Sequence, residues 1–149
     1  MPPLSHTRSV TVEEFFQANA DHVAYQIRVL FDEFQDEQWD SRLVPGAMSP
    51  RETLVHLSDC YQCASQRIRG EKPNWGSFQT AESDPVRIKE VMLEMRNRAI
   101  QEALGAGNHE LLAEIFAYIQ EHDSYHVGQL CLLKLRQDPN WDPYSIYPR

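Results

Sequence analysis

Residues 112–133 read LAEIFAYIQEHDSYHVGQLCLL, and apolar side chains recur in this stretch every three or four positions. This is the period of one face of an α-helix, which turns about 100° per residue. Two histidines, His122 and His126, stand on that face where another Leu or Ile would be expected. The spacing predicts a long helix whose buried face carries two imidazoles one turn apart. The apolar positions of the face are Leu112, Ile115, Phe116, Ile119, Leu130 and Leu133.

Three further helices are predicted from capping residues and from the same apolar period. Thr11 with Glu14, and Ser49 with Glu52, have the spacing of a capping box, in which two side chains satisfy backbone N–H groups at a helix start. Prolines and glycines between the apolar stretches mark the helix ends. The four predicted helices cover approximately residues 12–34, 50–69, 85–105 and 109–137.

The fold class that follows is all-α, and the expected architecture is a four-helix bundle. The chain of 149 residues is long enough for one sizeable core, so a single domain over residues 1–149 is expected. The connections after the first and second helices are long, and residues 38–49 and 72–83 are expected to fold over one end of the bundle. The aromatic tail, residues 138–144, is expected to pack on the bundle or on a partner subunit.

Composition limits the classes of partner. The formal charge is −8, from 22 acidic and 14 basic residues, which argues against a surface that follows nucleic-acid phosphates. No apolar run approaches the roughly 20 residues that cross a bilayer, so no membrane association is expected. Three cysteines are an odd number and too few for a disulfide framework. A cytoplasmic location is therefore the prediction.

A metal ion is one partner that makes buried imidazoles acceptable in an apolar interior. The best candidate for a third ligand is His56, which lies beside the apolar stripe of the second predicted helix. Facing helices would then present three ring nitrogens and leave a further position for water or substrate, as in catalytic zinc sites. The remaining histidines fit less well, because they lie outside or beside the apolar stripes: His6, His22 and His109.

At this point the chain resembles a known family. Trp39 and Pro45 precede the stretch SPRETLVHL at residues 49–57, and HDSYHVGQ follows at residues 122–129. This pattern is similar to that of the DinB/YfiT-like superfamily, and its diagnostic parts are the His-Leu pair and the His-x-x-x-His-x-Gly-Gln stretch.

The resemblance implies a four-helix bundle, often a homodimer, that holds a divalent metal on three histidines. Those histidines match His56, His122 and His126 of this chain. The resemblance does not imply one reaction, since relatives include transferases and isomerases that use low-molecular-weight thiols and members without an assigned substrate.

Other polar residues near the predicted ligands have two interpretations each. Asp59, Asp123 and Gln129 lie three residues from one of the predicted ligands, where their side chains either fix imidazole tautomers in the second shell or are solvated helix residues. Cys60 and Cys63 form a C-x-x-C in the middle of a helix, which predicts small apolar fillers rather than a redox pair. Cys60 is nevertheless one turn from His56 and remains an alternative ligand.

Two functions are open from the sequence. The leading hypothesis is a metal-dependent enzyme in which Zn²⁺ or Ni²⁺ activates a thiol for transfer, or a water for hydrolysis, on a small-molecule substrate; a low-molecular-weight thiol is a possible cosubstrate by family resemblance. The alternative is a non-catalytic bundle, metal-stapled or metal-free, that acts in protein association. An open coordination position favours the enzyme, whereas a fourth protein ligand favours the staple.

Overall fold

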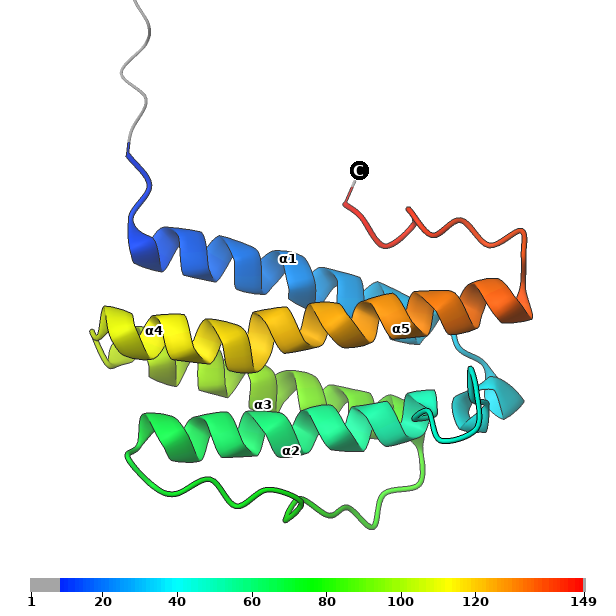
Figure 1. Cartoon of the computed structure of the whole chain (residues 1–149), viewed down its shortest axis with the longest axis horizontal. Helices are drawn as coiled ribbons and strands as arrows, with labels where there is room; N and C mark the ends of the chain where they lie inside the picture. Colours follow the sequence, from blue (N-terminus) through cyan, green and yellow to red (C-terminus); the bar gives the residue numbers. More distant parts are fainter. Residues whose placement is uncertain (1–8, 149) are drawn as a thin grey trace, which may run out of the picture.

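The computed structural model describes residues 9–148, which are helical and contain no strand (Figure 1). Both predicted capping boxes form: the Thr11 and Ser49 hydroxyls accept hydrogen bonds from the backbone N–H groups of Glu14 and Glu52, at 3.1 and 3.2 Å. The glutamates accept the reciprocal bonds, so each helix starts where its cap predicts. The elements are α1 Val12–Asp32, η1 Asp36–Asp40, α2 Pro50–Ile68, α3 Pro85–Gly105, α4 His109–Phe116, η2 Ala117–Glu121 and α5 His122–Gln137.

The fourth predicted helix is one rod that contains a π-helical turn. The turn, η2, joins α4 to α5 without a break (Figure 1). Ile115, Ile119, Asp123 and Val127 are buried at successive steps of four residues, which is longer than the 3.6 residues of an α-helical turn. The wider π turn absorbs this difference and keeps the buried positions facing the core. Such turns are frequent at functional sites, and here His122 follows directly.

The four rods share one hydrophobic core, as a bundle requires. Figure 1 shows α2 and the α4–α5 rod running side by side, with α1 and α3 behind them. Each rod contributes fully or almost fully buried apolar residues, among them Leu30, Leu57, Ile100, Leu112 and Leu130. The prediction of an all-α four-helix bundle is confirmed.

The two long connections behave differently. Residues 38–49 lie at one end of the bundle, as expected (Figure 1). Trp39 in this segment is buried, and its ring stacks on that of Phe31 with the ring centroids 6.0 Å apart. The expectation that residues 72–83 also cover an end is wrong, because they run along the outside of α2 (Figure 1). The carboxylate of Asp59 holds them there, accepting backbone hydrogen bonds from Gly76 at 2.8 Å and Phe78 at 2.9 Å.

The C-terminal segment packs on the bundle, in line with its aromatic composition. It turns back after α5 (Figure 1), and Ile146 is buried in the common core. Tyr147 meets the ring of His22 on α1 at a centroid distance of 5.9 Å. Within residues 9–148, no helix combines the length and the apolarity that crossing a membrane requires.

Candidate metal centre

Three imidazoles from two rods meet between α2 and α5. The Nε2 atoms of His56 and His122 are 3.2 Å apart, and those of His122 and His126 are 3.1 Å apart. The ring centroids of the three residues lie 4.6 to 5.1 Å from one another. The structure therefore brings together the three histidines that the sequence singles out as metal ligands.

Local structure explains why these rings face one another. His122 and His126 are one turn apart at the start of α5, so their rings project from the same face of that helix. His56 lies in α2, whose start is fixed by the Ser49 cap. The π turn immediately before His122 sets the rotation of α5 about its axis, and with it the direction of both rings.

The site holds its histidines in the neutral form. Burial, together with the charges of His122 and His56, lowers the pKa of His126 to about 4, although Gln129 acts in the opposite direction. Burial also lowers the pKa of His56 and of His122, both of which are half-buried. Neutral imidazole is the form that binds metal ions, so these rings need lose no proton to act as ligands at neutral pH.

Two of the three nitrogen pairs have nearly the spacing that a divalent metal requires. Two nitrogens bound tetrahedrally at about 2.0–2.1 Å from zinc are separated by about 3.3–3.4 Å. The observed Nε2 separations of 3.1 and 3.2 Å are close to that value. The Nε2 atoms of His56 and His122 belong to a donor group compact enough for one metal ion, whereas His126 lies outside that group and reaches it through its contact with His122.

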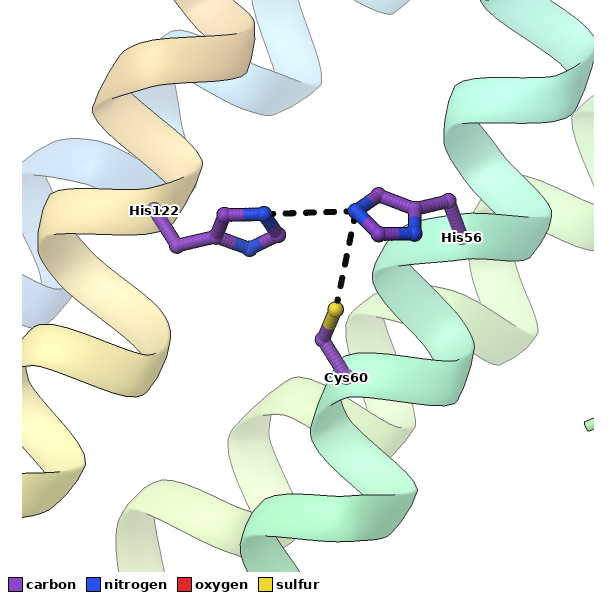
Figure 2. A group of neighbouring side chains, drawn as sticks. All are labelled: His56, Cys60 and His122. Carbon is purple, nitrogen blue, oxygen red and sulfur yellow. Dashed lines mark hydrogen bonds between the residues drawn. The ribbon is translucent and has the colours of Figure 1, made fainter. Parts of the chain in front are cut away.

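A cysteine adjoins the three rings (Figure 2). Sγ of Cys60 is 3.7 Å from Nε2 of His56, and the donor atoms of His56, Cys60 and His122 all lie within 4.8 Å of one another. Burial raises the pKa of the Cys60 thiol to about 12, so in the absence of a metal it is protonated. Cys60 and Cys63 are both buried in α2, as expected of small fillers, but Cys60 also faces the candidate site.

The predicted second-shell residues have different surroundings. Asp59 binds the backbone of residues 76–78, and its negative charge also acts on His56, raising the pKa of that ring against the effect of burial. Gln129 is exposed, donates to the hydroxyl of Tyr125 at 2.8 Å and interacts with the ring of His126. Their roles beside a bound metal stay predictions.

Asp123 belongs to a buried network that faces away from the imidazoles. Its carboxylate accepts hydrogen bonds from the Tyr61 hydroxyl at 2.7 Å and from Nε of Arg96 at 2.8 Å. Arg96 also donates to the backbone carbonyl of Ala20 at 3.0 Å, so the network joins all four rods. Sequence reasoning missed Arg96, although a signal exists: it lies four residues after Met92, on the buried stripe of α3.

The remaining histidines lie apart from the centre. His22 is exposed on α1 beside Tyr147, and His109 at the start of α4 pairs with Glu13 at 2.7 Å. His6 lies outside the described residues. The structure thus separates the three predicted ligands from the other described histidines.

The lowered histidine pKa values predict a pH-dependent stability for the metal-free protein. Below the ordinary pKa of 6.5, an unfolded chain takes up protons that folded His126 does not bind until about pH 4. The free energy of unfolding should therefore fall between these pH values, by about 2 kcal/mol from pH 7 to pH 5 for His126 alone. Urea unfolding of chelator-treated protein at both pH values measures it. His126→Gln should show a smaller drop, and an equal drop would contradict the assignment.

One comparison with known proteins identifies the family of the chain. A sequence model of the DinB superfamily matches residues 19–130, which span His56, His122 and His126. Neither the curated proteins nor the solved structures yielded a match to the chain. The family match covers most of the chain, and the helical bundle is the architecture expected of that family. The chain belongs to the DinB superfamily.

Proposed function

We propose that this protein is a metal-dependent enzyme that activates a thiol or a water on a divalent ion held by His56, His122 and His126. The observation that supports it best is that Nε2 of His122 lies 3.2 Å from Nε2 of His56 on the facing helix and 3.1 Å from Nε2 of His126. Zn²⁺ or Ni²⁺ suits imidazole donors of this kind. The proposed reaction is thiol transfer or hydrolysis on a small-molecule substrate.

The surroundings of the three rings support a reactive site rather than a sealed one. His56 and His122 are half-buried, so the outer side of the cluster is partly exposed to solvent, whereas His126 is only 4% exposed. A divalent ion bound there supplies a positive charge that three neutral imidazoles do not cancel, which lowers the pKa of a thiol or water ligand. This difference in exposure gives the centre an inner wall and an accessible face.

Side chains at the accessible face offer contacts for a substrate. The exposed ring of Tyr125 lies edge-on to the ring of His126, with centroids 5.1 Å apart. The Tyr125 hydroxyl accepts the hydrogen bond from Gln129, which fixes both side chains beside the centre. We propose that this pair contacts the substrate and orients it toward the imidazoles.

The test combines metal analysis with activity. Purified protein should contain about one divalent ion per chain, and the loaded form should consume a small thiol with electrophilic substrates or hydrolyse simple esters or amides. His56→Ala should lose both metal and activity while remaining helical by circular dichroism, and His22→Ala should retain both. Stoichiometric metal without turnover across thiol and hydrolase substrates would contradict the enzyme proposal.

A specific observation favours the second function, a metal-stapled bundle. The Cys60 sulfur lies 3.7 Å from Nε2 of His56, where it can serve as a fourth protein donor. Structural zinc sites have four protein ligands, whereas catalytic sites keep a position open. On the staple proposal, chelation should lower the melting temperature markedly and no substrate should turn over.

A further inference from the structure

Two helices each carry a pair of side chains that can bind a metal, and the two pairs have the same spacing in the sequence. On α5, His122 and His126 are four residues apart, and on α2, His56 and Cys60 are four residues apart. Residues at this spacing project from one face of a helix, one turn above the other. Across the α2–α5 boundary, Nε2 of His122 lies 3.2 Å from that of His56 and 3.1 Å from that of His126, and the donor atoms of His56, Cys60 and His122 form one group.

We infer that Cys60 is a fourth protein ligand of the metal centre, which closes the site and favours the metal-stapled bundle over the enzyme. This inference rests on the proposed metal centre, and it goes beyond the three histidines by assigning a ligand role to a residue of α2. On binding, the Cys60 S–H bond breaks, its proton passes to solvent, and the sulfur donates an electron pair to the ion.

The distances agree with this assignment. A nitrogen at about 2.05 Å and a sulfur at about 2.3 Å from a tetrahedral zinc are separated by about 3.6 Å. Sγ of Cys60 and Nε2 of His56 are 3.7 Å apart, and Figure 2 shows the sulfur directed at that ring nitrogen. His122 completes the cluster, since all three donor atoms lie within 4.8 Å of one another. The nitrogen–sulfur distance lies within about 0.1 Å of the tetrahedral value, and the two nitrogen–nitrogen distances within about 0.3 Å of theirs.

Burial places Cys60 on the inner side of the centre. Its side chain is 3% exposed, whereas His56 and His122 are half-buried, so the sulfur lies beneath the rings rather than at the solvent face. A thiolate donor also changes which ions the site accepts, because soft sulfur ligands favour zinc over magnesium, calcium or manganese. Cys63, in the same helix and equally buried, is the matched thiol that does not belong to the donor group.

Cobalt substitution tests the inference without any assay of activity. Full-length protein is freed of metal, kept reduced with a phosphine rather than a thiol, and titrated with Co²⁺ alone. A cysteine ligand gives an intense sulfur-to-cobalt charge-transfer band in the near ultraviolet, which histidine ligands do not produce. We expect this band to saturate at about one equivalent in the wild type, to disappear in Cys60→Ser and Cys60→Ala, and to persist in Cys63→Ser. Zinc affinity of the two Cys60 variants should fall about tenfold or more.

The outcomes separate the two proposals. If one equivalent of Co²⁺ binds without the band, or if the band survives in either Cys60 variant, Cys60 is not a ligand and the three-histidine centre stands. If the wild type binds no Co²⁺ at all, the metal centre itself fails and the inference fails with it. Circular dichroism of both Cys60 variants establishes that a lost band does not reflect a lost fold.

Discussion

Replacement of Asp123 by Asn should lower the free energy of unfolding by about 3–5 kcal/mol, the range for breaking a buried ion pair from one side. The Asp123 side chain is 0% exposed and that of its partner Arg96 is 4% exposed. Asn keeps the shape of Asp and still accepts from Tyr61, but it leaves the guanidinium without a counter-charge in the core. Urea unfolding of both proteins at pH 7 provides the measurement.

A half-exposed ion pair with comparable geometry serves as the control. Arg67 and Glu114 make two hydrogen bonds of 2.7 and 2.9 Å between α2 and α4, with both side chains at least one-third exposed. Glu114→Gln should therefore cost less than about 1 kcal/mol. If the two variants lose similar stability, the interpretation that burial makes the Asp123 pair costly to break is wrong.

The expected loss of stability in Asp123→Asn arises from leaving Arg96 charged and unpaired in the core, and not from a large net stabilisation by the ion pair. Burial raises the pKa of Asp123, although Arg96 and Tyr61 act in the opposite direction, so ionising this carboxyl in the core is itself unfavourable. Removing both charges while keeping an acceptor for Tyr61, as in Asp123→Asn with Arg96→Met, should recover much of the stability lost in Asp123→Asn. A double variant no more stable than the single one would indicate that shape, not charge, explains the loss.

The parts of the fold that depend on local chemistry could be predicted from the sequence. Thr11 with Glu14, and Ser49 with Glu52, form their capping boxes because the donors and acceptors lie within one turn of each other. The histidine pair on α5 was equally readable, since the spacing of four residues fixes the shared face. Predicting His56 as a third ligand required the additional expectation that its helix faces α5.

The features that depend on long-range packing could not be predicted in the same way. The sequence of Ala117–Glu121 does not differ from that of an ordinary helix. The π turn forms there because Ile119 and Asp123 must both face the other rods of the bundle. Residues 72–83 lie along α2 because Asp59 binds their backbone, a contact between segments about 17 to 19 residues apart. For Asp123 the sequence left open a role beside the imidazoles or a solvated position, whereas the structure buries its carboxylate against Tyr61 and Arg96.

His126→Ala should abolish the stabilisation of the protein by zinc. A ligand that binds only the folded state at 100 times its Kd stabilises that state by about 2.7 kcal/mol. Loss of a buried donor 3.1 Å from the nitrogen of His122 should weaken zinc binding at least about 100-fold, as even groups that only orient a ligand contribute 10- to 100-fold. At the same free zinc concentration the variant should then retain no more than about 0.4 kcal/mol.

The experiment compares urea unfolding with buffered free zinc and with chelator, for the wild type and for His126→Ala. His109→Ala is the matched control, because His109 is on the same rod but is exposed and paired with Glu13 far from the other imidazoles. It should keep the full zinc effect. Equal zinc stabilisation in all three proteins would mean that zinc binds elsewhere, and the role assigned to the buried ring would have to be abandoned. Loss of the effect in His126→Ala alone would link metal binding to the one imidazole that the fold withdraws almost completely from solvent.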